Sequence, residues 1–176
     1  TSVGLDAIGF AVFGNGVQPI NLTSALPTIT DAVIIDGTTQ PGFAGTPLIE
    51  LNGASAGAGV NGLRITGSNS TVRGLVINGF SGSGIVLSGA AAIGNIIEGN
   101  YIGTNATGTA ALANGTDGIL IQAGASNNTI GGTTVAARNI ISGNTSIGVL
   151  IQGVGTATNI VQGNYIGVDA AGTGPL

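Results

Sequence analysis

The chain repeats itself at a fixed offset. Residues 84–112 read GIVLSGAAAIGNIIEGNYIGTNATGTAAL, and residues 148–176 read GVLIQGVGTATNIVQGNYIGVDAAGTGPL. The two segments align without a gap at an offset of about 64, with about 13 of 29 positions identical. Internal similarity of this kind indicates stacked structural units, each of which buries its apolar face against the next. This feature constrains the fold more than any other in the sequence.

Short apolar runs recur inside this long repeat. Examples are VIID from residue 33, LRIT from 63, LVIN from 75, IVLS from 85 and ILIQ from 119. Each run is rich in Ile, Val or Leu and is bounded by Gly or Asn, which is the pattern of a β-strand. No stretch keeps an apolar stripe at helical spacing, because Gly interrupts it every few residues. The sequence therefore predicts an all-β fold.

The spacing of these runs predicts how the strands stack. LVIN to NIIEGN, LRIT to IVLS, and NIISGN to NIVQGN are each separated by about 20–22 residues, and longer gaps hold insertions at 103–117 and 131–138. This period predicts a parallel β-helix, a solenoid of about 20–22 residues per coil with inserted loops, in which coils about 4.8 Å apart share one core. Residues 1–176 are expected to form one domain. Regular coils would cover 31–176, and the less regular 1–30 would be either a partial cap or an earlier coil.

Glycine–asparagine pairs mark candidate bends of the coils. They occur at 99–100, 143–144 and 163–164. Gly adopts positive φ freely, and Asn tolerates it better than most residues. If Asn100, Asn144 and Asn164 occupy equivalent bends, their amides would hydrogen-bond up the stack as a ladder. The alternative is that each Asn satisfies only its own turn.

Longer segments resemble a known family. GNYIGTNATGTAAL, NNTIGGTTVAARNIISGN and ALPTITDAVIIDGTTQPGF are similar to segments of large bacterial secreted or surface proteins, often called adhesin-like. The resemblance covers about residues 15–176. It implies right-handed parallel β-helix repeats of the pectate-lyase-like superfold. A shared fold does not carry a shared function, so the function has to be argued from the residues.

Composition excludes several classes of partner. Charged residues are 6% of the chain, with three Arg, no Lys and a net charge of −4, so the basic footprint of a nucleic-acid binder is missing. No apolar run approaches the roughly 20 residues that span a bilayer. Cys and His are absent, which leaves no disulfide and no Cys or His metal ligand. The chain starts at Thr1 without a leader pattern, so we expect any signal peptide to be removed or to lie outside this segment.

Acid–base catalysis has few candidate residues. Asp31 and Asp36 are interpreted as turn and strand-end residues, and Glu50 and Glu98 as strand residues that point into solvent. Arg73 is expected one coil from Glu98, as a surface ion pair worth under about 1 kcal/mol. We therefore predict no catalytic, cofactor-binding or metal-ligating residue, and no enzyme. Polysaccharide lyase or hydrolase activity, calcium at Asp169, and ice binding through Thr remain as weaker alternatives.

These observations predict a non-catalytic structural segment of a secreted or cell-surface, fibrous or adhesin-like protein. Its partners would be neighbouring repeats or further copies, contacting it through the ends of the solenoid, where unpaired strand edges are exposed. The chain would be either a piece of a longer array or a subunit that stacks end to end into filaments. A carbohydrate or host surface is a further partner class. The alternative function is a carbohydrate-binding or polysaccharide-degrading module.

Overall fold

Parallel β-strands make up almost all of the regular structure. The computed structural model describes residues 5–176, which contain one short 3₁₀ helix, η1 (Gly37–Thr39), and no α-helix. Sheet A contains β1 (Asp6–Gly9), β3 (Val33–Asp36), β6 (Thr71–Arg73), β9 (Ile96–Glu98), β12 (Thr129–Gly131) and β15 (Ile160–Gln162). Sheet B contains β2 (Gln18–Asn21), β4 (Ile49–Asn52), β7 (Leu75–Asn78), β10 (Tyr101–Ile102), β13 (Ile140–Ile141) and β16 (Tyr165–Ile166). Sheet C contains β5 (Leu63–Ile65), β8 (Ile85–Ser88), β11 (Ile119–Gln122) and β14 (Val149–Ile151).

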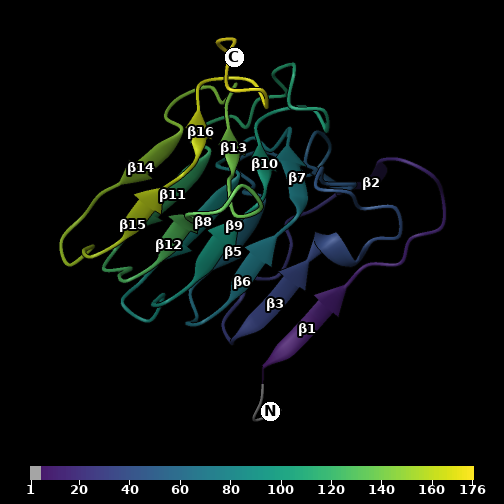
Figure 1. Cartoon of the computed structure of the whole chain (residues 1–176). Coiled ribbons are helices and arrows are strands. Elements are labelled where there is room, and N and C mark those ends of the chain that lie inside the picture. The colour runs from purple at the N-terminus through teal and green to yellow at the C-terminus, as the bar shows by residue number, and fades with distance from the viewer. Residues whose placement is uncertain (1–4) are drawn as a thin grey trace.

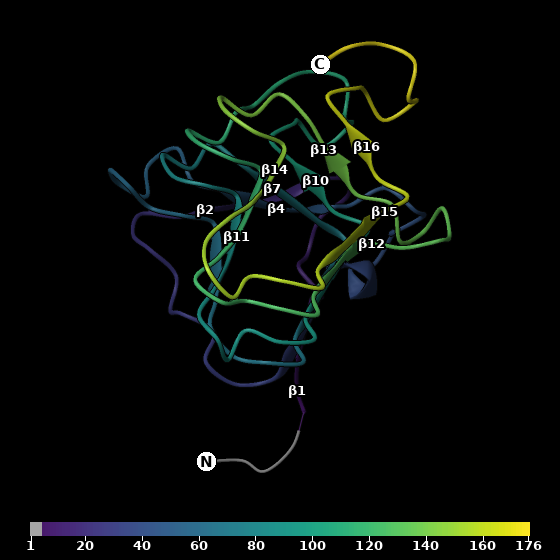
Figure 2. The ribbon, with the colours of Figure 1, turned by 90° about the vertical axis from the view of Figure 1, so that its left-hand side faces the viewer.

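The chain visits the three sheets in a fixed order. It runs through a strand of sheet A, then sheet B, then sheet C, and returns to sheet A beside the strand that it left (Figure 1). We call one such passage a coil. In the first coil, the place of a sheet C strand is taken by Ile29, which forms an isolated parallel bridge to Ile65. Viewed from the left-hand side of Figure 1, roughly along the stack, successive coils overlap one another (Figure 2). The predicted all-β, parallel-strand architecture is confirmed, and it is compatible with a parallel β-helix.

Columns of aliphatic side chains fill the interior. Strand residues alternate between the two faces of a sheet, and the inward ones come into register from coil to coil. In sheet A the inward column is Ile35, Val72, Ile97 and Ile130, which are successive pairing partners and at most 8% exposed. Sheets B and C contribute matching columns that contain Ile77, Ile102 and Ile141, and Leu87 and Ile121. One continuous core therefore runs along the stack.

The predicted coil length is too short for most of the chain. Leu63 pairs with Ile85, at the spacing expected for LRIT and IVLS. The other paired strands lie further apart along the sequence, for example Thr71 and Ile96, or Tyr101 and Ile140. LVIN lies in sheet B and NIIEGN begins in sheet A, so these two segments are not partners. NIISGN and NIVQGN likewise begin in different sheets, because inserted loops change the length of every coil.

The long sequence repeat corresponds to two coils. Ile96 and Ile160 occupy equivalent positions of the repeat, and Thr129 lies between them as the pairing partner of both. The loops 103–112 and 167–176 have the same relation, and each is closed by an antiparallel bridge, Thr104 with Ala111 and Val168 with Pro175. The two loops also touch, since the backbone N–H of Ala170 donates to the carbonyl of Gly108 at 2.9 Å.

Buried asparagines form a ladder at each of the three corners between sheets. The corner between sheets A and B holds Asn100, Asn139 and Asn164; that between B and C holds Asn114 and Asn144; that between C and A holds Asn95, Asn128 and Asn159. The expectation of amide ladders is confirmed. The predicted membership is wrong for Asn144, which belongs to a different corner from Asn100 and Asn164. The Gly before each of these three residues has φ of 65–70°, so glycine makes the bend and asparagine the ladder.

Every ladder uses the same hydrogen bonds. The Oδ1 of Asn139 accepts from the backbone N–H and the Nδ2 of Asn100 in the coil before, at 2.9 and 3.2 Å. Its Nδ2 donates to the carbonyl of Ile97, at 2.8 Å, and to the Oδ1 of Asn164 in the coil after, at 2.9 Å. Each rung thus satisfies a backbone donor and a backbone acceptor that the bend would leave unpaired in the interior.

Candidate functional site

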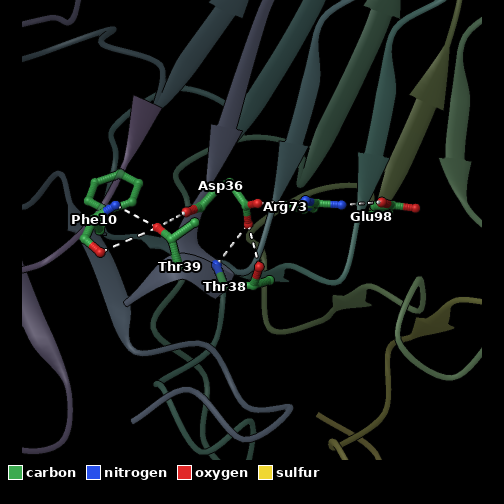
Figure 3. A network of polar contacts seen from close by, with 6 residues as sticks. All are labelled: Phe10, Asp36, Thr38, Thr39, Arg73 and Glu98. Carbon is green, nitrogen blue, oxygen red and sulfur yellow. Dashed lines mark hydrogen bonds and ion pairs between the residues drawn. The ribbon is translucent and has the colours of Figure 1, made fainter. Parts of the chain in front are cut away.

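Three charged side chains form a row across sheet A. Asp36, Arg73 and Glu98 end the adjacent strands β3, β6 and β9 and are pairing partners in register (Figure 3). Nη2 of Arg73 lies 2.6 Å from Oδ2 of Asp36, and Nη1 lies 3.9 Å from Oε1 of Glu98. The expected pairing of Arg73 with Glu98 is present, but Asp36 makes the shorter contact. Sequence reasoning missed it because Asp36 and Arg73 are much further apart in sequence than the assumed coil length.

Hydroxyl groups hold Asp36 from the other side. Asp36 is the N-cap of η1, and its Oδ1 accepts from the backbone N–H of Thr38 at 3.0 Å and from the Thr38 hydroxyl at 2.5 Å. The Thr39 hydroxyl donates to the Asp36 carbonyl at 2.8 Å and accepts from the backbone N–H of Phe10 at 2.6 Å (Figure 3). The network therefore ties four successive coils together.

The electrostatics of this row keep Asp36 and Arg73 charged. Burial raises the pKa of Asp36, but the hydrogen bonds from Arg73 and Thr38 outweigh burial and hold it below its usual value. The hydrogen bond to Asp36 raises the pKa of Arg73. A general acid or base works best with a pKa near the working pH, and both groups lie far from neutrality. The arrangement suits an ion pair that fixes strand register better than proton transfer.

A shallow groove lies beside the row. One cavity of about 270 Å³ is lined by Thr38, Phe43, Arg73, Glu98 and Thr134, together with small residues. A second, of about 100 Å³, is lined by Tyr101, Val135 and Arg138, and shares Gly45, Gly99 and Ala136 with the first. The guanidinium of Arg138 lies 4.1 Å from the centre of the Tyr165 ring, a cation–π contact. Two of the three arginines, Arg73 and Arg138, and two aromatic residues, Phe43 and Tyr101, thus line one groove. No motif in the sequence had indicated this groove.

Four further acids accept hydrogen bonds, two of them from the next coil. Asp31, Asp117 and Asp169 each accept a backbone N–H, at 2.8, 3.2 and 2.9 Å. Glu50 is half-buried and accepts from Nδ2 of Asn78 at 2.7 Å, so it does not simply point into solvent as expected. Backbone N–H groups of Thr173 and Gly174 lower the pKa of Asp169. Among residues 5–176, no group of three or more His, Cys, Asp or Glu side chains could hold a metal ion.

Comparisons with known proteins identify no relative of this chain. No family model, no curated protein and no solved structure matches the chain. The resemblance to bacterial surface proteins therefore stays an expectation. In the part of the chain that the structure describes, no helix is long and apolar enough to cross a membrane.

Proposed function

We propose that this chain is a non-catalytic structural segment, a right-handed parallel β-helix, of a secreted or cell-surface fibrous protein. The observation that carries the proposal is the set of amide ladders at all three corners. Five of their eight asparagines are fully buried, and each of these five is bonded to both neighbouring coils. Buried polar networks in which every member is satisfied rigidify a core.

The charged groups support the same interpretation. Asp36 and Arg73 neutralise each other and are held in their charged forms, which favours a structural role over acid–base catalysis. The ends of the stack are suited to contact neighbouring coils, either of a longer array or of further copies. This contact would make the segment part of an extended, adhesin-like rod.

An activity screen tests the absence of catalysis. Pectin, alginate and related acidic polysaccharides are incubated with the protein, and unsaturated or reducing-end products are measured. We expect no product above a blank without protein. Sustained turnover would overturn the structural assignment. Loss of that turnover in Arg73→Ala, but not in Arg64→Ala, would place the activity in the groove, because Arg64 is exposed on sheet C.

A carbohydrate-binding module is the second candidate function, and the groove favours it. Phe43, Arg73, Glu98 and Thr134 line the cavity of about 270 Å³, and Tyr101 lines the adjoining cavity of about 100 Å³, so aromatic rings, donors and acceptors lie together. Ligand sites commonly combine apolar lining with a few polar groups that set orientation. Amide chemical shifts recorded during titration with neutral and acidic oligosaccharides test it. Saturable shifts confined to the groove and abolished by Phe43→Ala would support binding, and their absence at millimolar sugar would exclude it.

A further inference from the structure

The two arginines of the groove differ in how far their charge is neutralised. Arg73 is paired on both sides, at 2.6 Å from Asp36 and 3.9 Å from Glu98. These are the only ion pairs among residues 5–176, so no carboxylate of the described chain neutralises Arg138. Arg138 lines the smaller cavity and therefore gives the groove a positive charge that a ligand can reach.

The chain holds the guanidinium of Arg138 in place through its other atoms. Nε donates to the carbonyl of Gly163 at 3.0 Å, and the guanidinium lies 4.1 Å from the centre of the Tyr165 ring. The two terminal nitrogens donate to no group in the part of the chain that the structure describes. They can thus offer two parallel donors to one carboxylate, the geometry of bidentate recognition. Because the side chain is fixed beforehand, less freedom is lost on binding.

Glu98 is the second charged group of the groove that is incompletely paired. Its side chain is 28% exposed, lines the larger cavity and lies 3.9 Å from Nη1 of Arg73. Within the described residues it accepts no hydrogen bond shorter than this contact. A carboxylate is an acceptor only, so Glu98 can receive hydroxyl groups of a sugar. A second anionic group at the same place would be repelled.

Glu98 and Arg138 are close enough for one ligand to contact both. The backbone N–H of Gly99, which follows Glu98, donates to the carbonyl of Ala137, which precedes Arg138, at 3.1 Å. The two charged residues therefore lie in adjacent coils, whose backbones are about 4.8 Å apart. The lining residues that the two cavities share are all Gly or Ala, so the cavities adjoin without a large side chain between them.

We propose that the groove binds an acidic polysaccharide in which uronate and neutral sugars alternate. This inference rests on the carbohydrate-binding function, the second candidate above, and specifies its ligand. The carboxylate of one sugar binds the terminal nitrogens of Arg138, and the neutral sugar beside it donates a hydroxyl to Glu98. Phe43 and Tyr101 add apolar contacts in the two cavities. A polymer with a carboxylate on every sugar is disfavoured, because its next carboxylate would face Glu98.

Three saccharides of equal length test the proposal. A hyaluronan tetrasaccharide alternates uronate with N-acetylglucosamine, tetragalacturonate has a carboxylate on every sugar, and the tetramer of N-acetylglucosamine has none. Each is titrated into isotope-labelled protein, and Kd is obtained from the amide shifts of the groove residues. We expect the hyaluronan tetrasaccharide to bind at least about tenfold more tightly than the other two, which is the size of effect that a charge-assisted hydrogen bond provides.

Substitutions assign this selectivity to the two charged residues. Arg138→Gln should weaken binding of the hyaluronan tetrasaccharide about tenfold, to the level of the neutral tetramer. Glu98→Gln should strengthen binding of tetragalacturonate, and a gain of binding cannot arise from misfolding. Arg64→Gln is the matched control, because Arg64 is exposed on sheet C, and it should leave all three affinities unchanged. Urea unfolding verifies that each variant is folded.

The contrary results overturn the proposal at different levels. Equal affinities for the three saccharides, unchanged in Arg138→Gln and Glu98→Gln, would remove the ligand assignment and leave carbohydrate binding standing. Equal affinity for a peptide of alternating aspartate and serine would show that the groove recognises a carboxylate without the sugar. No shifts with any saccharide would overturn both the ligand and the second candidate function. The structural function would survive all of these results, because it is tested by polysaccharide turnover.

Discussion

Replacing Asn139 with alanine should destabilise the protein far more than the same change at Asn164. Asn139 is fully buried, and its side chain makes four hydrogen bonds within one ladder. Its removal leaves the backbone N–H of Asn100 and the carbonyl of Ile97 without this partner in the interior. An orphaned buried group costs about 1–3 kcal/mol. Two such groups and the residual cavity give an expected loss of about 3–5 kcal/mol. That is a large part of the roughly 5–15 kcal/mol that stabilises a typical domain.

Asn164 is the matched control, because it is the same residue in the same ladder but lies at its half-buried end. Water can replace its partners, so Asn164→Ala should cost only about 1 kcal/mol. Urea unfolding followed by circular dichroism gives both free energies of unfolding. Hydrogen exchange at the Asn100 amide should accelerate in Asn139→Ala. If the two variants lose equal stability, or Asn139→Ala loses less than about 1 kcal/mol, the ladders do not stabilise the fold as argued.

Three further changes probe other parts of the structure. In Gly118→Ala, the added Cβ would lie 2.6 Å from the carbonyl oxygen of Gly148, so thermal unfolding should show a loss of about 1–3 kcal/mol. In Gly148→Ala, the one close contact would be a side-chain methyl of Ile166 at 2.6 Å, with the next atoms at 3.7 Å, so the loss should be smaller. Ile97→Ala should cost about 2–5 kcal/mol in urea, while Ile96→Ala, the adjacent residue at 38% exposure, should cost under about 1 kcal/mol, and similar values would place the core wrongly. Because the pKa of Asp36 is lowered on folding, its stabilisation is present above pH 3.8 and is lost as the pH falls through the folded-state pKa. Unfolding measured across this range should therefore show wild type losing its advantage over Asp36→Asn, and a constant difference would contradict the pKa argument.

The strands were predictable from sequence, but their partners were not. Runs of Ile and Val between Gly and Asn reveal strands because the pattern is local and fits within a single run. Pairing depends instead on the length of the loops between strands. The interval from Tyr101 to its partner Ile140 is much longer than the interval from Ile140 to Tyr165, although each spans one coil. The long repeat was visible in the sequence because it spans two coils. The unequal lengths of single coils compensate within each pair, so the offset of the repeat stays constant.

The ladders explain why motifs of similar sequence were predicted to stack on one another although they lie in different sheets. NIIEGN, NIISGN and NIVQGN begin and end with asparagine, and in each case both asparagines are ladder rungs at the two ends of one strand. The motif therefore marks a strand between two corners, without indicating which sheet holds it. The groove was not predictable either, since Phe43, Tyr101 and Arg138 come from three different coils.

The contact between the loops 103–112 and 167–176 has a consequence for how the stack unfolds. Stacked repeats usually touch only their nearest neighbours, so their unfolding follows a one-dimensional chain of pairwise couplings. Here Ala170 bonds Gly108 across an intervening coil, and the backbone N–H of Gly143 in that coil donates to the carbonyl of Leu176 at 3.2 Å. The intervening coil is therefore held together with the coil before it and the coil after it by contacts of the two loops. The coils in this region should therefore fray in pairs, and the cooperative unit is twice the smallest hydrogen-bonded repeat.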